Sequence, residues 1–282
     1  MYSASRYRTR RLIGSVFFAA AVAAMILFLV FPIYVMFITS VESYSEIFRS
    51  PPAWIPNEWH WGNYVQVWQS LPLLRLLGNS AIVAVSTVLL NLLVSFPAAY
   101  ALARYRFRGN QLVRLTMLFT QMLSPVIVLI PLFQILKVLH LINTLPGLIL
   151  VQLGFTSAFT VWLLIGFFQQ IPLELEEAAI VDGASIPQVL IRIVVPTAAP
   201  GIFASAMYAF ISVWSDFVFA FTLISSESKK LVTVGLFDLA GARVTHWELL
   251  MGAALIAIVP TFTVFLYMRR FLVSGGWSGA IK

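Results

Sequence analysis

The sequence predicts an all-α membrane protein with six transmembrane helices, and three observations support this fold class. Hydrophobic residues make up 60% of the 282 residues and charged residues only 10%, whereas ordinary soluble domains carry about 25% charged residues. The mean hydropathy is +0.92, so the chain lacks the polar surface that a soluble globule needs. The apolar residues also gather in long runs, and about 20 consecutive apolar residues cross the hydrocarbon layer as a helix.

Six apolar runs follow one another along the chain and are expected to form a single transmembrane domain over residues 1–282. The first run follows a polar arm with four arginines and is too long for the core of a signal peptide. The third run contains Pro125 and Pro131 and is expected to be kinked, with neighbouring helices satisfying the freed carbonyl groups. The predicted spans are residues 12–38, 76–102, 115–136, 148–168, 201–224 and 249–267.

The connections between the runs differ in character. Residues 39–75 hold acids, prolines and several tryptophans and tyrosines, which suits an interfacial segment with short helices, because amphipathic rings favour the headgroup level. Residues 225–247 are expected to form a polar loop. Residues 268–282 are expected to form a short, glycine-rich tail.

The distribution of basic residues predicts the orientation. Six spans place both termini on the same side, where twelve of the 18 lysines and arginines lie. Cytoplasmic loops carry an excess of basic residues, so both termini are expected in the cytoplasm. The same distribution accounts for the net charge of +7, so the charge does not imply that the protein binds nucleic acid. Single-strand binding would also require a basic run that alternates with exposed aromatic residues, and the sequence has none.

Residues 169–199 then form a cytoplasmic loop with an unusual composition, because acidic and small residues stand between two apolar runs. Pro172 presets the backbone of a helix start, and acids near that start complement the helix dipole. The helix is expected to run to about Asp182 and to stop at Gly183, which takes the left-handed conformation easily. The acids are Glu174, Glu176 and Glu177.

A second helix is expected in the same loop, with Ser185 as its N-cap and its end before Pro196. Charge alone favours an interpretation without a specific function, in which the loop is a solvated acidic connector with incidental alanines. The order of the residues favours a functional interpretation of the loop instead. "EAA" at residues 177–179 is followed at fixed spacing by Gly183, Ile193, a hydrophobic residue and Pro196. This pattern resembles the cytoplasmic signature of the permeases of binding-protein-dependent ABC importers.

The resemblance extends over roughly residues 71–282 and is closest to the carbohydrate-uptake branch, specifically its maltose-type second permease subunit. Ser215 departs from the family pattern, which has an amide in that place, and Trp277 departs from the pattern of the final segment. The similar stretches are "NS" at 79–80, "AYALARYRFRG" at 99–109, "INTLPGLIL" at 142–150, "DGASIPQVLIRIVVPTAAPG" at 182–201, "VWSDF" at 213–217 and "SGGWSGAIK" at 274–282.

The resemblance implies the type I ABC importer permease fold, in which the loop is a coupling helix that docks into a cytoplasmic ATPase subunit. Glu177 would make the charged contact, the alanines would allow close approach, and Gly183 would form the turn. The tail, with Gly279 and Lys282, would also reach the ATPase. The residues implied in docking are Glu177, Ala178, Ala179, Asp182, Gly183 and Ala184.

The resemblance also implies the partners of the chain in a bacterial or archaeal inner membrane. These are membrane lipid, a second similar permease, an extracytoplasmic sugar-binding protein and two ATPase subunits, which would hold ATP and Mg²⁺. No cofactor is expected in this chain. Spans two to six would form the shared core, span one would wrap the partner permease, and residues 39–75 and 225–247 would meet the binding protein.

Asp216 is the only acid within a predicted span. A carboxylate at the centre of a membrane helix costs about 3 kcal/mol, so it is expected to face the bundle or water. It could accept hydrogen bonds from a passing sugar beside Trp214, hold a neighbouring span, or lie near enough to the outer surface to be solvated. Other polar positions could line the path or join helices, namely Asn79, Gln121 and Gln152. Such a neutral path fits an uncharged polar solute.

Several chemistries are excluded by missing motifs. The sequence has no G-x-x-x-x-G-K-[ST], so the chain is not itself a P-loop ATPase, and its histidines have no H-E-x-x-H spacing, so no metal site or catalytic residue is expected. Two rival functions remain open. An ion-driven secondary transporter would need a titratable group on the path, for which Asp216 is the candidate. An intramembrane enzyme is disfavoured because paired catalytic groups are missing.

Overall fold

The computed structural model describes residues 3–241 and 244–276, and within these ranges every regular element is a helix. The chain divides into two compact units. The first consists of residues 1–71 with 239–256, and the second of residues 72–238 with 257–282. In the part of the chain that the structure describes, four helices are long and apolar enough to cross a membrane, and up to six spans result if each of two bent helix pairs counts as one.

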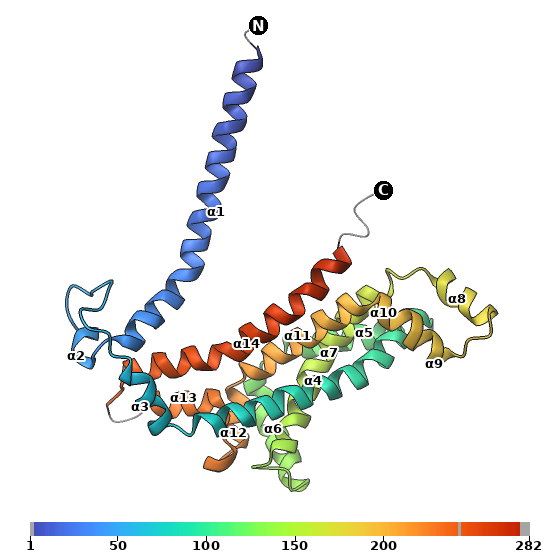
Figure 1. Ribbon diagram of the computed structural model, residues 1–282. Helices are drawn as coiled ribbons and strands as arrows, with labels where there is room; N and C mark the ends of the chain where they lie inside the picture. The colour runs from blue at the N-terminus through green and yellow to red at the C-terminus, as the bar shows by residue number, and fades with distance from the viewer. Residues whose placement is uncertain (1–2, 242–243, 277–282) are drawn as a thin grey trace. The chain divides into compact units, whose positions relative to one another are not determined.

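The first unit begins with α1 (Ser3–Val41), whose apolar segment Phe17–Val41 is only 6% buried. Two short helices follow, α2 (Tyr44–Ile47) and α3 (Gly62–Ser70), as expected for an interfacial segment (Figure 1). Because so little of this segment is buried, its apolar side chains are left for lipid or for a partner helix.

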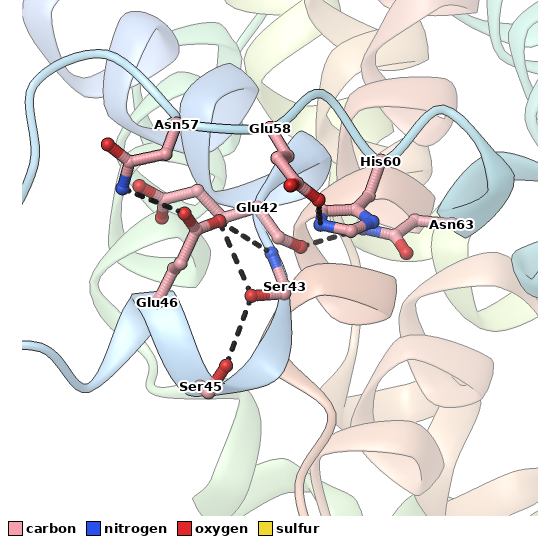
Figure 2. A network of polar contacts seen from close by, with 8 residues as sticks. All are labelled: Glu42, Ser43, Ser45, Glu46, Asn57, Glu58, His60 and Asn63. Atoms are coloured by element: carbon pink, nitrogen blue, oxygen red, sulfur yellow. Dashed lines mark hydrogen bonds and ion pairs between the residues drawn. The ribbon is translucent and has the colours of Figure 1, made fainter.

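Polar contacts hold the chain between these helices of the first unit in one conformation (Figure 2). Asn63 on α3 donates from Nδ2 to the carbonyl oxygens of Ser40 and Glu42, at 3.0 and 2.9 Å. Asn57 donates to the carboxylate of Glu46 at 3.0 Å. The two bonds from Asn63 satisfy carbonyl groups that α1 leaves free at its end, and the bond from Asn57 fixes the side chain of Glu46.

The core of the second unit is formed by α4 (Leu73–Arg104), α7 (Leu145–Phe168) and α11 (Ala199–Trp214), which contact one another (Figure 1). A buried polar link joins two of them, because Asn91 of α4 donates to the hydroxyl of Thr156 of α7 at 2.7 Å. The hydroxyl of Ser95 donates in turn to Oδ1 of the Asn91 side chain at 2.7 Å. Such bonds between helices contribute about 0.6 kcal/mol each in a membrane.

The third apolar run forms two helices, α5 (Asn110–Met122) and α6 (Pro125–Val138), inclined at 102° to each other. The break lies directly before Pro125, whose ring disfavours a helical conformation of the residue that precedes it. The pair is therefore either a broken span or a re-entrant loop.

The fifth run departs from the expected continuous helix over 201–224. Helix α11 ends at Trp214, and a short helix, α12 (Val218–Leu223), begins after a break. The carboxylate of Asp216 accepts the backbone N–H of Ala220 at 3.0 Å, so this acid caps α12 from within the break.

Two further predictions about the connections are wrong. Part of the expected polar loop 225–247 is helical, with a 3₁₀ turn (Glu227–Lys229) and α13 (Val232–Ala240). The apolar sequence of α13 buries Val232 and Val234 in the second unit, which explains the helix. The expected tail is helical in its first part, because α14 (Trp247–Gly276) continues well beyond residue 267.

The start of α7 depends on a glycine. A Cβ atom at Gly147 would lie 2.2 Å from the carbonyl oxygen of Leu141, whereas one at Gly154, later in the same helix, would meet nothing within 4 Å. We therefore expect Gly147→Ala to destabilise the protein by about 2 kcal/mol, as overpacked sites do, and to lower its melting temperature in detergent. Gly154→Ala is the matched control. Equal melting temperatures for the two variants would contradict this packing.

Candidate functional site

The loop over residues 169–199, here called the EAA loop, begins with α8 (Leu173–Val181), whose N-cap is Pro172. The helix ends as the sequence predicts. Gly183 takes a φ of +87°, and the N–H of Ala184 donates to the carbonyl of Ala179 at 2.9 Å. A glycine in this left-handed conformation reverses the chain and satisfies a free carbonyl of the last helical turn.

The second helix of the EAA loop has Ser185 as its N-cap, and the N–H of this serine donates to Gln188 Oε1 at 2.9 Å. The helix consists of α9 (Ile186–Val189), a π-turn (Leu190–Val194) and α10 (Val195–Thr197).

The prediction that this second helix ends before Pro196 is therefore wrong. The N–H of Val195 donates to the carbonyl of Leu190, and the hydroxyl of Thr197 donates to the carbonyl of Ile193 at 2.6 Å. The π-turn and this hydroxyl compensate for the N–H that proline lacks, so the helix continues past it. A bend of 77° then leads into α11.

A buried ion pair joins α8 to the end of α4. The carboxylate of Glu176 lies 2.5 Å from Arg104 Nη2, and the two side chains are only 3% and 11% exposed. Tyr100 donates from its hydroxyl to the other oxygen of Glu176 at 2.7 Å. Arg104 also donates to the carbonyl of Ile171 at 3.0 Å, just before α8 begins. Both oxygens of the carboxylate are thus paired, which is the condition under which a buried ion pair is tolerated.

An apolar cluster lies beneath the EAA loop and fixes both of its helices. Val189 and Val194 of the loop are fully buried with Phe168 at the end of α7 and Leu102 at the end of α4. Ala179 and Ala184 pack partly against the same cluster. The EAA loop is therefore an extension of the helix bundle, held by apolar contacts and by the ion pair.

The residues expected to dock with an ATPase divide into two groups. Glu177, Ala178, Asp182 and Gly183 are exposed, whereas Ala179 and Ala184 are half-buried against the apolar cluster. Next to the exposed group lies Val181, an apolar side chain that is 86% exposed. Figure 1 shows α8 projecting beyond the ends of the other helices of its unit. Gly279 and Lys282 lie outside the described residues.

Three of the residues expected on the substrate path line one cleft of about 220 Å³ in the second unit. Asp216 uses its carboxylate to cap α12, and Gln121 donates to the carbonyl of Phe155 at 3.1 Å. Gln152 is 3% exposed, and its Nε2 lies near Asp216 without the geometry of a hydrogen bond. The cleft thus contains one buried amide donor without a partner among the described residues.

The other two expected path residues lie away from this cleft. Trp214 is buried, donates from Nε1 to the carbonyl of Ala257 at 3.1 Å and stacks on Phe210. Asn79 donates to the carbonyls of Ser228 and Lys230, so it holds the 3₁₀ turn.

The sequence analysis missed three aromatic side chains that line the cleft, which are Phe155, Phe219 and the one with a polar group, Tyr208. Tyr208 lies on α11 with its ring centre 4.2 Å from that of Phe159. It stands six residues before Trp214, or about 1.7 turns, so the two side chains lie on different faces of α11 and the position of Trp214 gave no signal for Tyr208.

A comparison of the sequence with known protein families decides the class of the protein. Residues 91–274 match the family described as binding-protein-dependent transport system inner membrane component. The chain belongs to this family. It is a permease subunit of an ATP-driven ABC importer in a prokaryotic membrane, and it is not itself an enzyme, since ATP is hydrolysed by a separate subunit.

Two relatives cover nearly the whole chain. The inner membrane ABC transporter permease protein YcjP of Escherichia coli (strain K12) is 30% identical over 275 residues, which span 97% of this chain and 98% of YcjP. The sulfoquinovosyl glycerol transport system permease protein SmoH of Agrobacterium fabrum is 32% identical over 263 residues, which span 93% of this chain and 92% of SmoH.

A solved structure shares the fold. It is a chain of a bacterial ABC transporter involved in the import of the acidic polysaccharide alginate, with a TM-score of 0.80 and 23% identity. The match covers 96% of this chain and 98% of that chain. The predicted all-α fold of an ABC importer permease is thus confirmed.

Removing one partner of the ion pair tests its role. Glu176→Gln leaves Arg104 buried without a counter-charge, which costs about 3–5 kcal/mol, so we expect a large drop in melting temperature. Glu174→Gln, an exposed acid on the same helix, is the control and should melt like the wild type. The double variant Arg104→Met with Glu176→Leu should recover much of the loss, because no buried charge remains. An unchanged melting temperature for Glu176→Gln would refute the assignment.

Proposed function

We propose that this permease imports a sugar or a related uncharged polar solute, and that ATPase motion enters it through α8. The solute would come from an extracytoplasmic binding protein, and the full transporter would contain a second similar permease and two ATPase subunits. The main support for the proposal is the buried ion pair between Glu176 and Arg104, because it fixes α8 to the end of a transmembrane helix.

The proposed path of the motion runs through packed elements. A force on α8 reaches the end of α4 through the ion pair and through the hydroxyl of Tyr100. Helix α4 contacts α7 and α11 along its length, and these two helices supply Gln152 and Tyr208 to the cleft. Packed elements shift as bodies and deform little, so a displacement of α8 would reopen or close the cleft.

The exposed end of α8 is the proposed docking surface for the ATPase. Ala178 offers no side chain beyond a methyl group, Val181 offers an apolar contact, and Glu177 offers a charge to the partner. The half-buried Ala179 and Ala184 would act indirectly, by letting α8 lie close to the bundle. Gly279 and Lys282 would add contacts from the tail.

The proposed topology has six spans in one transmembrane domain with both termini in the cytoplasm. The spans would be formed by α1, α4, the bent pair α5–α6, α7, α11 with α12, and α14. This arrangement would put the EAA loop on the cytoplasmic side and residues 39–71 and 225–246 on the binding-protein side.

The proposed solute class follows from the cleft and from the relatives. The cleft presents Gln152, Tyr208 and the amide of Gln121, groups that exchange hydrogen bonds with hydroxyls, and no lysine or arginine lines it. SmoH belongs, by its name, to a transport system for sulfoquinovosyl glycerol, a sugar derivative with a charged sulfonate, so this relative supports the sugar class, and the preference for an uncharged solute rests on the cleft alone. An ion-driven transporter is not favoured, because the chain belongs to an ATP-driven family and Asp216 already accepts backbone hydrogen bonds.

Docking is tested by enlarging the methyl group of Ala178. An indole in a closely packed interface costs about 2 kcal/mol, so Ala178→Trp should weaken ATPase binding roughly thirtyfold, measured by co-purification with the ATPase and by ATP-driven uptake in proteoliposomes. Gln170→Trp, on an exposed turn before α8, is the control. Normal assembly and uptake of Ala178→Trp would exclude α8 as the docking element.

The role of Asp216 separates the two transport mechanisms. Asp216→Asn keeps an oxygen that can cap α12 but cannot carry a proton or bind a cation by charge. We expect ATP-driven uptake to stay within about threefold of the wild type, since a neutral acceptor replaces a charged one at a cost below about 1 kcal/mol, and to persist when ion gradients are collapsed. Abolished uptake in Asp216→Asn with normal stability would favour an ion-driven mechanism instead.

A further inference from the structure

A second pocket lies in the first unit, at the end of the apolar segment of α1. It has a volume of about 390 Å³. Two carboxylates line it, Glu42 and Glu46, together with the aromatic side chains of Phe31, Tyr34 and Trp54. No lysine or arginine is among its lining residues. The pocket therefore combines negative charge with aromatic faces, and it has no place in the transport path described above.

Glu42 is the residue that makes this pocket unusual. It is only 5% exposed, and among the described residues no side chain or backbone group donates a hydrogen bond to its carboxylate. The backbone from which it projects is fixed, because Asn63 donates to the carbonyl oxygens of Ser40 and Glu42 (Figure 2). A buried carboxylate is stabilised by a charged or hydrogen-bonding partner, and Glu42 lines the pocket, from which such a partner could reach it.

The second carboxylate is held in place. Glu46 accepts hydrogen bonds from Asn57 Nδ2 at 3.0 Å and from the N–H of Ser43 at 3.3 Å. The bond from Asn57 lowers the pKa of Glu46, so it stays ionised. Burial, and then the charge of Glu46, raise the pKa of Glu42. Glu42 and Glu46 are thus neighbouring acids whose pKa values shift in opposite directions. A cation between them would stabilise the charged form of both carboxylates.

The aromatic wall is also fixed. Tyr34 donates from its hydroxyl to the carbonyl of Trp54 at 2.5 Å, and the ring centres of Phe31 and Trp54 lie 6.1 Å apart. Aromatic faces attract ammonium groups by about 0.5–2 kcal/mol, and tryptophan and tyrosine favour the level of the lipid headgroups.

We infer that this pocket binds the primary ammonium group of an aminophospholipid headgroup. The carboxylate of Glu42 would accept hydrogen bonds from the ammonium, and Glu46 would add charge. A lipid is favoured over a basic side chain of a partner protein because the pocket adjoins the candidate span Phe17–Val41. Leu27 and Phe28 of that span are 70% and 78% exposed and offer an apolar surface for the acyl chains.

The experiment compares lipids with the purified full-length permease in nanodiscs of dioleoyl lipids. We expect native mass spectrometry to show about tenfold stronger retention of phosphatidylethanolamine than of phosphatidylcholine, because a choline group has no N–H to donate to a carboxylate. Glu42→Gln should remove this preference. Glu58→Gln, which changes a side chain that is 81% exposed outside the pocket, should keep it.

Equal retention of the two lipids by the wild type would overturn the proposal, and so would a preference that survives Glu42→Gln. If Glu42→Gln does not fold, Glu46→Gln takes its place, and the wild-type comparison of lipids decides in any case. A wild type that shows no lipid preference, but whose Glu42 can be cross-linked by a carbodiimide to the purified binding protein, would assign the pocket to a basic side chain instead.

Discussion

Two opposite charges, Arg104 and Glu176, meet in a place that water hardly reaches, at the junction of α4 and α8. Removing either charge alone leaves the other uncompensated, so the pair is a constraint that both helices must satisfy together. The hydroxyl of Tyr100 and the carbonyl of Ile171 add two further hydrogen bonds, whereas Arg104 Nε has no partner among the described residues. Without this junction, α8 would be a short helix at the end of a loop, with apolar contacts on one side only.

Packed helices of the second unit connect this ion pair to the cleft. Helices α4, α7 and α11 pack on one another, and Asn91 and Thr156 link two of them inside the bundle. At the far end of α11 the chain breaks at Asp216, whose carboxylate starts α12. Under the proposed coupling, the fixed junction at one end would transmit the motion of α8, and the break at the other end would let the chain move near the solute.

Much of this architecture could be predicted from the sequence. Hydropathy located the apolar runs, and the local chemistry of Gly183 and Ser185 placed the turn and the second cap, because both act on adjacent residues. The ion pair could not be predicted, since Arg104 and Glu176 stand 72 residues apart and each has neighbours of like charge. Hydropathy also cannot tell which face of a helix meets a cleft, so Trp214 was expected where Tyr208 lies.

A distance measured between α8 and α4 shows whether the two helices move as one body. The chain contains no cysteine, so spin labels on cysteines at Val181 and Leu93, which are 86% and 72% exposed, would be the only two. If the junction is rigid in the assembled transporter, we expect one narrow distance distribution that is the same with and without ATP. A distribution that shifts or broadens when ATP binds would contradict this rigidity.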